Sequence, residues 1–196
     1  MRNSIVRLLP VLAFCAFVSL SSFAAADDKV KLSVISDINN TIRAGGAVPG
    51  MEEAYKRLVE KGAVFHYISY SSWSEAEEIK EFLGKWGFPE GTLHLRGSKG
   101  GFFDFAQRPS DSKPPAIRKL LEENPDRRFI LIGDSGWQDP EIYGAIARAY
   151  PGRIKHIYIR RVTSEAPRDA RFRQAFSGLE DAQWTVFTDP KEIKAE

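Results

Sequence analysis

The chain has 196 residues, of which 28 are Lys or Arg and 26 are Asp or Glu, so its formal net charge is only +2. This near balance excludes a global basic field that would draw the protein to nucleic acid or to an anionic membrane. The only cysteine is Cys15. The chain beyond it therefore has no disulfide, no thiol nucleophile and no cysteine-based metal site.

Residues 1–26 have the layout of a secretory signal peptide. Arg2 and Arg7 give a positive start, residues 11–20 form an apolar stretch, and residues 24–26 are three alanines that suit a cleavage site. The apolar stretch is shorter than the ~20 residues that a membrane span requires. We therefore expect export and not membrane anchoring.

A rival interpretation of this segment is a lipoprotein box at residues 12–15, but the bulky Phe14 before its cysteine argues against lipidation. We expect cleavage near Ala26, with the product in the periplasm or outside the cell. The mature chain, 27–196, then carries 26 basic and 26 acidic residues. Its length of roughly 170 residues suits one domain with a sizeable core.

Short runs rich in β-branched and aromatic residues alternate with helical patterns along the mature chain. Several runs are apolar on both faces, as strands of a covered parallel sheet should be. The predicted strands cover residues 32–36, 63–69, 92–95, 128–133, 153–159 and 184–187. The predicted helices cover residues 51–62, 76–87, 116–124, 141–150 and 168–176, the last being basic and read as a solvated face.

The helices have recognisable start signals. Proline stands at or just before three of them, and Ser74 with Glu77 forms a capping-box pattern. Alternating strands and helices predict an α/β fold with right-handed crossovers and a doubly wound parallel sheet. We see no insertion long enough for a cap domain. Ligands of such sheets bind at the carboxyl ends of the strands.

The most informative motif follows the first predicted strand. Residues 36–43 read SDINNTIR, which resembles the D-x-D-x-T pattern of a large phosphotransferase class. There the first Asp attacks phosphorus and the second transfers the proton. Asp37 and Thr41 match this pattern, but Asn39 replaces the second acid, and an amide cannot exchange that proton at neutral pH.

Further polar groups follow the other strands. Ser69 ends the second strand, Lys113 precedes a helix, and residues 133–139 supply Asp134 and Asp139. Transfer of a phosphoryl group to a carboxylate brings two anions together and needs a hard cation between them. Carboxylate oxygens are the ligands that Mg²⁺ prefers, while hydroxyls and an ammonium hold the phosphoryl oxygens.

This ordered set resembles the haloacid-dehalogenase (HAD) superfamily over nearly the whole mature chain. More narrowly, the chain resembles the catalytic domain of the fungal actin-patch phosphatidate phosphatase family and its bacterial relatives. The matching stretches are SDINNTI, PGMEEAY, FHYISYSSW, EFLGKWGFPEGTLHLR, FILIGDSGWQDPEIY and HIYIRRV. The wider group includes the Mg²⁺-dependent lipins. It also includes lipin-like domains that bind phosphatidic acid without hydrolysing it.

The resemblance implies a role for each matching position. Asp37 would be the nucleophile, Ser69 the phosphate-binding hydroxyl and Lys113 the charge stabiliser. The metal ligands would be Asp37, Asp134, Asp139 and the backbone carbonyl of Asn39. The family pattern is SDIDDTI, so the chain departs from it at residues 39 and 40. Because general acid–base catalysis contributes about 10²–10⁴-fold, hydrolysis of alkyl phosphates should be slower by about that factor.

The mouth of an uncapped site suits a phospholipid or another large phosphomonoester. Residues 96–113 are predicted to form a long loop, whose aromatics either fold back to form a small core or contact a membrane, as exposed aromatics do at lipid interfaces. Further substrate contacts are expected from Thr41, Ser71, Trp73, Trp137 and Arg160. The aromatics that this prediction concerns are Phe102, Phe103 and Phe105. The three histidines, His66, His94 and His156, are expected to serve packing and not metal binding.

Two functions remain open at this point, with a weaker third. The chain is a slow Mg²⁺-dependent phosphatase, or a binding module that captures a phosphate or phosphatidic acid without turnover. The third is a phosphotransfer enzyme whose good leaving group tolerates a neutral residue at position 39. Asp139 also has two interpretations, since it could ligate the metal or cap the helix that Pro140 opens.

Overall fold

The computed structural model describes residues 31–97 and 112–194. The strands are β1 (Lys31–Asp37), β2 (Val64–Ser72), β3 (Gly91–Arg96), β4 (Arg127–Asp134), β5 (Ile154–Arg160) and β6 (Trp184–Phe187). The helices are α1 (Met51–Glu60), α2 (Ala76–Lys85), α3 (Lys113–Glu123), α4 (Asp139–Ala149) and α5 (Ala170–Ala175). All six predicted strands are therefore present, most of them a residue or more longer than expected.

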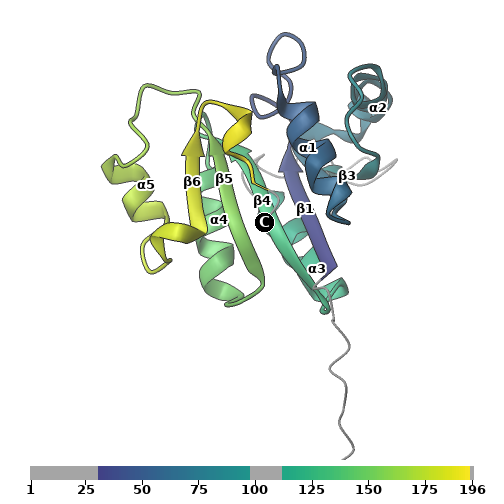
Figure 1. The fold of residues 1–196 in the computed structure, drawn as a ribbon. Coiled ribbons are helices and arrows are strands. Elements are labelled where there is room, and N and C mark those ends of the chain that lie inside the picture. Colours follow the sequence, from purple (N-terminus) through teal and green to yellow (C-terminus); the bar gives the residue numbers. More distant parts are fainter. Residues whose placement is uncertain (1–30, 98–111, 195–196) are drawn as a thin grey trace, which may run out of the picture.

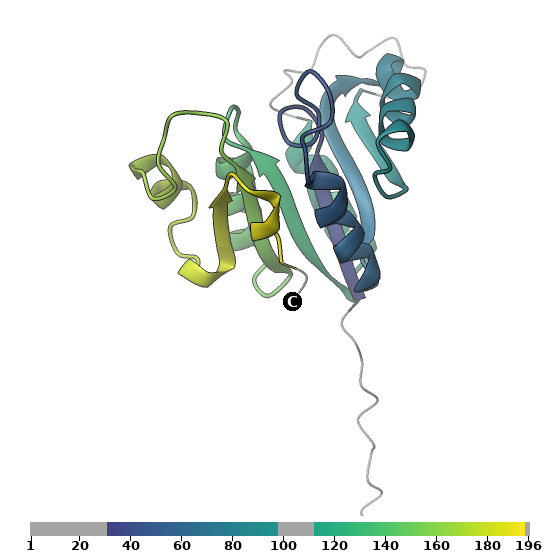
Figure 2. The same cartoon turned by 45° about the horizontal axis from the view of Figure 1, so that its top comes forward.

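The strands form one parallel sheet in the order β3-β2-β1-β4-β5-β6. Helix α1 crosses one face in front of β1, and α4 lies behind β5 (Figure 1). Figure 2 shows the same two layers from another angle, with α1 again in front of the sheet. This arrangement confirms the predicted doubly wound α/β fold. The strand order reverses between β1 and β4, which is where such folds bind their ligands.

The period-2 alternation of β1 explains why the sheet is covered on both faces. Val34 packs into one buried cluster with residues of α1 and α2, while its neighbour Ile35 packs into the other with residues of α3 and α4. Successive side chains of a strand point to opposite faces. A strand that is buried on both faces therefore needs helices on both sides, as the sequence predicted.

Two local predictions need correction. The predicted capping box of Ser74 and Glu77 is wrong by two residues. The backbone N–H of Ser72 donates to the Glu75 carboxylate at 2.9 Å, and a one-turn 3₁₀ helix, Trp73–Glu75, precedes α2. The second strand also runs three residues beyond its predicted end, so Ser69 lies within β2 and not at its end.

Some predictions fall outside the described residues. These are the signal peptide and the aromatics Phe102, Phe103 and Phe105. Within residues 31–97 and 112–194, no helix combines the length and apolar character that crossing a bilayer would need. The stretch between β1 and β2 consists of a turn and α1.

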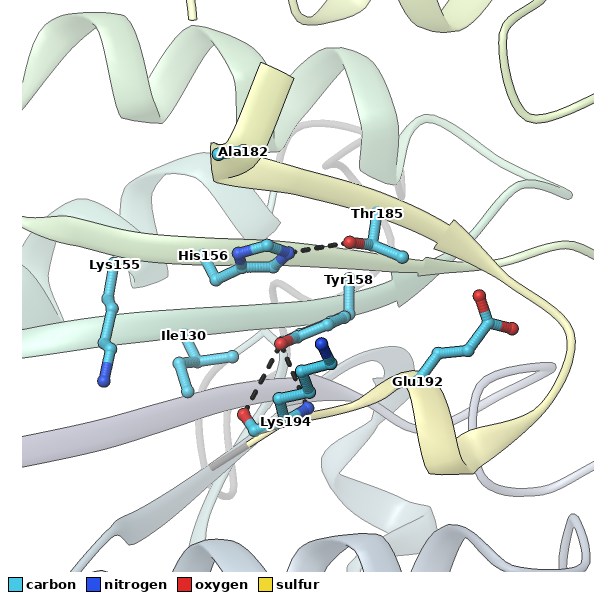
Figure 3. Close-up of a pocket in the computed structure, with 8 residues that line it drawn as sticks. All are labelled: Ile130, Lys155, His156, Tyr158, Ala182, Thr185, Glu192 and Lys194. Atoms are coloured by element: carbon cyan, nitrogen blue, oxygen red, sulfur yellow. Dashed lines mark hydrogen bonds between the residues drawn. The ribbon is translucent and has the colours of Figure 1, made fainter. Parts of the chain in front are cut away.

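The face of β4, β5 and β6 on the α1 side carries a groove of about 570 Å³. The C-terminal segment closes one side of it, where the Tyr158 hydroxyl meets the backbone of Lys194 (Figure 3). This groove lies on the face of the sheet and includes none of the residues that the sequence assigned to catalysis, metal binding or substrate contact, although His156 lines it.

Candidate active site

The nucleophile candidate lies at the point where the strand order reverses. Asp37 is the last residue of β1, and Asp134 is the last residue of the neighbouring β4. Both side chains are buried. Because parallel neighbouring strands end at the same edge of a sheet, their carboxylates come close together although the two residues are far apart in sequence.

Lys113 joins this edge from α3, of which it is the first residue. Its Nζ lies 2.7 Å from Asp37 Oδ1 and 2.6 Å from Asp139 Oδ1. The lysine is 2% exposed and Asp139 is 0% exposed. The ammonium also lies 4.5 Å from the centre of the Tyr70 ring, a distance at which a cation is attracted to an aromatic face. The lysine is thus held from three sides.

Asp139 is the first residue of α4. Its side chain makes its hydrogen bonds to Lys113 and to the backbone of Asp134 and does not cap the helix. Its Oδ2 accepts a hydrogen bond from the backbone N–H of Asp134 at 3.2 Å. Glycine at position 133 leaves room for it, because a Cβ there would collide with the Asp139 carboxylate. A Cβ at Gly136 would lie 2.8 Å from Asp134 Oδ1, which accepts that glycine's N–H at 2.6 Å.

The residues present fit a divalent cation. Asp37, Asp134 and Asp139 each offer an oxygen, and these oxygens lie within 4.8 Å of one another. Among the residues that the structure describes, these three buried carboxylates surround one ammonium, that of Lys113, which leaves an excess of negative charge for a cation to balance. Hard oxygen donors of this kind are those that Mg²⁺ and similar ions prefer.

The pKa values of the acidic side chains reflect the same imbalance. Burial raises the pKa of Asp134 to about 6, and the charge of Asp139 adds to that rise. Burial likewise raises the pKa of Asp139 to about 6, against the lowering effect of Lys113. The pKa of Asp37 is raised by burial too, again opposed by Lys113. Burial would lower the pKa of Lys113, but Asp139 and Asp37 outweigh it and raise that pKa.

Hydroxyl groups line the other side of Asp37. The hydroxyl of Thr41 donates to Asp37 Oδ2 at 2.8 Å, which fixes the carboxylate. The Nδ2 group of Asn39 donates to Ser69 Oγ at 3.3 Å and to Ser71 Oγ at 3.4 Å. Strand β2 has an irregular register with β3 in this region, and bulges of this kind re-aim side chains next to active sites.

The amide of Asn39 is fixed from its oxygen side as well. Arg43 donates to Asn39 Oδ1 from Nε at 3.1 Å and from Nη2 at 2.8 Å. A third guanidinium nitrogen pairs with Glu78 at 3.0 Å. The neighbouring Asn40 has a left-handed backbone with φ 59°, a conformation that Asn tolerates better than most residues.

These groups open into a cleft of about 340 Å³. The cleft is lined by Asp37, Asn39, Tyr70, Ser71, Glu75, Arg96, Lys113, Asp134 and Trp137. Sequence reasoning missed Tyr70, Glu75 and Arg96 among these. The signal that could have found Tyr70 is its position between Ser69 and Ser71.

Two residues that the sequence assigned to substrate contact, Trp73 and Arg160, are not among those that line the cleft. Trp73 packs against the apolar cluster of α1 and α2, whereas Trp137 lines the cleft and is 60% exposed. Arg160 donates to the backbone carbonyl of Asn40 at 2.6 Å and so supports the turn after β1. The structure thus brings together the acidic cluster, Lys113 and the serines, while Arg160 interacts electrostatically with Asp134 and Trp73 packs against the core.

The basic helix at the end of the chain is not only a solvated face. Arg171 of α5 donates to the backbone carbonyls of Ser135 and Trp137. It also pairs with Glu141 at 2.8 Å and with Glu165 at 3.4 Å. The arginine therefore braces the loop that carries Trp137 to the mouth of the cleft.

Fold and site together define a class: a doubly wound α/β domain with a buried acidic cluster and a lysine at the strand edge. Residues 43–161 match the family model described as phosphatidate phosphatase APP1, catalytic domain. The chain therefore belongs to this family. The matched range contains Ser69, Lys113, Asp134 and Asp139, and it begins just after the Asp37–Thr41 turn.

Two fungal proteins are similar to this chain. Phosphatidate phosphatase APP1 of Saccharomyces cerevisiae is 30% identical over 151 residues, covering 66% of this chain and 26% of the yeast protein. An uncharacterized protein of Schizosaccharomyces pombe is 24% identical over 159 residues, covering 70% of this chain and 26% of that protein. The chain thus spans about a quarter of the length of these relatives.

Proposed function

We propose that this protein is a Mg²⁺-dependent phosphatase of HAD type that hydrolyses a phospholipid or another phosphomonoester through an aspartyl-phosphate. The observation that carries the proposal is the buried Asp37 carboxylate, which shares the Lys113 ammonium with Asp139 and opens into a cleft. The name of the yeast relative, a phosphatidate phosphatase, supports a phospholipid as the substrate class.

Asp37 is the proposed nucleophile. One of its oxygens attacks phosphorus, the bond between phosphorus and the ester oxygen breaks, and its electron pair leaves on that oxygen. Thr41 orients the attacking carboxylate. Lys113 and Ser69 hold the phosphoryl oxygens, a form of preorganised electrostatic stabilisation that is worth most in a buried site. Water then attacks the aspartyl-phosphate, which releases phosphate and restores the Asp37 carboxylate.

Mg²⁺ would be held by Asp37, Asp134, Asp139 and the backbone carbonyl of Asn39, and when bound it would reduce the repulsion between the nucleophile and the anionic substrate. Asp139 has a second part in the proposal. Because it accepts a hydrogen bond from Lys113, it keeps that ammonium beside the nucleophile and charged.

Asn39 should slow the reaction of esters with poor leaving groups. Its amide cannot protonate the leaving oxygen, and such a proton transfer is worth about 10²–10⁴-fold. We therefore expect Asn39→Asp to raise kcat/KM for phosphatidic acid by roughly 10²-fold or more. The aryl ester p-nitrophenyl phosphate needs little protonation of its leaving group, so its kcat/KM should change little.

The test compares the wild type and Asn39→Asp on both substrates, with Mg²⁺ and with chelator. Hydrolysis of p-nitrophenyl phosphate by the wild type that disappears with chelator supports the enzyme. Loss of that hydrolysis in Asp37→Asn would show that it belongs to this site and not to a contaminant. If neither protein hydrolyses either substrate, the enzymatic proposal fails.

A second candidate function is a module that binds phosphate or phosphatidic acid without turnover. Asn39 favours it, because its amide donates to Ser69 and Ser71 where a phosphatase needs a proton donor to the leaving group. The outcome expected for this candidate is Mg²⁺-dependent binding to vesicles that contain phosphatidic acid, together with no hydrolysis in the wild type.

We propose export as the setting of this function, on the strength of the signal-peptide pattern in residues 1–26. Expression of the full chain followed by N-terminal sequencing should find a mature protein that starts near Asp27. An uncleaved chain that stays with the cytoplasmic fraction would contradict export. The proposed membrane contact of Phe102, Phe103 and Phe105 predicts weaker vesicle binding when all three are replaced by Ser.

A further inference from the structure

Trp137 is the most exposed large hydrophobic side chain among the residues that the structure describes, at 60%. It lies in the loop between β4 and α4 and lines the cleft. Its ring packs against that of Tyr70, with the ring centres 6.2 Å apart and the planes tilted by 56°, which is within the range at which aromatic pairs attract each other. A lone exposed aromatic needs no explanation, but this one is held in place on the wall of the cleft.

Arg171 of α5 fixes the backbone that carries Trp137. Its guanidinium donates to the carbonyl oxygens of Ser135 and Trp137. Two carboxylates hold the guanidinium in turn, that of Glu141 at 2.8 Å and that of Glu165 at 3.4 Å. The indole is therefore fixed both through its backbone and through its ring contact, so a ligand that packs against it loses little affinity to the ordering of the loop.

The ring of Tyr70 connects this aromatic pair to the charged part of the cleft. Its centre lies 4.5 Å from Lys113 Nζ, which lies 2.7 Å from Asp37. Asp37 is only 3% exposed, so the two rings extend from the buried part of the cleft toward solvent. The other described residues that line the cleft are polar or charged. Tyr70 and Trp137 thus form its apolar side, which we call the aromatic wall.

The direction of the proposed reaction places the alcohol of the substrate along the aromatic wall. In phosphoryl transfer the attacking and leaving oxygens lie roughly in line with phosphorus. Because the Asp37 carboxylate attacks from the buried end of the cleft, the alcohol leaves on the side of phosphorus that faces solvent. The exposed end of the aromatic wall, Trp137, lies on that side.

The spacing of the two rings favours an aliphatic group over a flat one. A flat ring inserted between two others needs roughly 3.5 Å on each side, or about 7 Å in all. The ring centres of Tyr70 and Trp137 are only 6.2 Å apart, so the pair offers no slot for a third ring. It presents one continuous apolar surface instead, over which a flexible chain can lie.

We propose that Tyr70 and Trp137 determine substrate specificity by packing against an aliphatic chain on the alcohol of the phosphomonoester, and that Arg171 is a positioning residue for this wall. The inference rests on the proposed phosphatase function and narrows its substrate class. Esters that carry an aliphatic chain within a few atoms of phosphorus bind more tightly than small polar ones such as glycerol 3-phosphate. The gain comes from apolar surface of the chain and of the indole that is removed from water.

The test measures the binding of phosphonates, whose carbon–phosphorus bond the proposed reaction does not break. Calorimetry with Mg²⁺ compares methylphosphonate, hexylphosphonate and phenylphosphonate, which share the charged head group. We expect the Kd of hexylphosphonate to be about 15-fold lower than that of methylphosphonate, the equivalent of two buried methylene groups. Phenylphosphonate should gain less. Because no probe is hydrolysed, the comparison does not depend on turnover.

Three variants separate the aromatic wall from the rest of the site. Trp137→Ala should reduce the preference for hexylphosphonate to about threefold or less, while the Kd of methylphosphonate stays within about twofold of the wild type. Arg171→Met, at a residue that does not line the cleft, should lower the same preference and also spare methylphosphonate. The matched control is Trp86→Ala, at an indole that is 44% exposed and lies 5.7 Å from Lys85 Nζ, and it should change neither Kd.

Equal affinity of the wild type for methylphosphonate and hexylphosphonate, or a preference that survives in Trp137→Ala, would overturn the aromatic wall and leave the phosphatase proposal intact. A larger gain for phenylphosphonate than for hexylphosphonate would overturn the assignment to an aliphatic chain. A hexylphosphonate preference in a wild type that hydrolyses no ester would support the wall and overturn the hydrolytic function. Absence of Mg²⁺-dependent binding of all three probes would overturn both.

Discussion

The cleft at Asp37 and the groove at Tyr158 are both hollows at the same sheet, but they differ in how their polar groups are paired. In the groove of about 570 Å³, His156 Nε2 lies 2.9 Å from Thr185 Oγ1, and the Tyr158 hydroxyl meets both the N–H and the C=O of Lys194 (Figure 3). In the cleft of about 340 Å³, buried carboxylates outnumber the ammonium that faces them.

The smaller hollow is therefore the one that we propose as the active site. A polar group that already makes its hydrogen bonds within the chain has little bonding capacity left for a ligand. Buried carboxylates without enough positive partners instead attract a cation, and a bound cation can in turn attract an anion. Unbalanced charge, and not volume, marks the reactive site here. Four changes test this contrast, from the largest expected effect to the smallest.

Replacing the nucleophile should have the largest effect. Asp37→Asn keeps the shape of the side chain but removes the attacking carboxylate, so hydrolysis of any phosphomonoester should fall on the order of 10⁵-fold or more, as for other enzymes that lose a covalent nucleophile. Steady-state kinetics with p-nitrophenyl phosphate measures this. The matched control is Asp126→Asn, at an exposed carboxylate that also pairs with a lysine at 2.7 Å. Activity retained in Asp37→Asn would mean that the reaction does not take place in this cleft.

Removing the buried ammonium should act on stability as well as on rate. Lys113→Met leaves Asp37 and Asp139 without their partner, and breaking a buried pair in this way costs about 3–5 kcal/mol of the free energy of unfolding. Lys31→Met breaks an exposed pair of equal length with Asp126 and should cost at most about 1 kcal/mol. Urea unfolding of both variants gives the comparison. Equal losses would mean that burial does not distinguish the two pairs.

Metal and protons should compete for the acidic cluster. The pKa values of Asp134 and Asp139 are raised to about 6, above the unfolded value near 4, so the folded state binds more protons between these values. By linkage, the contribution of these groups to metal-free stability is full below about pH 4 and is lost as pH rises through about 6.

Mg²⁺ requires the ionised carboxylates, so the rise in Tm that it causes should grow as pH increases through about 6. At 100 times its Kd the ion would stabilise the fold by about 2.7 kcal/mol. Thermal unfolding with Mg²⁺ and with chelator at pH 5 and pH 7.5 checks this. A rise of equal size at both pH values, or one that persists in Asp134→Asn, would contradict a metal site in this cluster.

The smallest effect is expected in the groove. Tyr158→Phe removes hydrogen bonds to the backbone of Lys194, which should cost about 0.5–1.5 kcal/mol and leave kcat/KM unchanged. A loss of activity beyond that of the stability-matched control Tyr150→Phe, whose hydroxyl meets Glu122 at 2.8 Å, would show that the groove takes part in function.

Much of the molecule followed from the sequence. The apolar runs and the alternation of strands and helices predicted the fold. A strand that is buried on two faces must be apolar on both, and this pattern can be recognised in its own short sequence. The strand-end rule predicted that Asp37, Ser69, Lys113, Asp134 and Asp139 would gather at one edge, and the structure brings them together. Their assigned roles stay predictions.

Other features depended on side-chain direction, which no local pattern records. Trp73 and Trp137 each follow a motif, yet Trp73 packs against the core from outside and Trp137 lines the cleft. The sequence determined where chain segments start, end and bury their faces, because that depends on neighbouring residues. The tertiary structure decided which group Asn39 faces, because Arg43, Ser71 and Glu75 meet only after β1 and β2 are aligned and the 3₁₀ turn is formed.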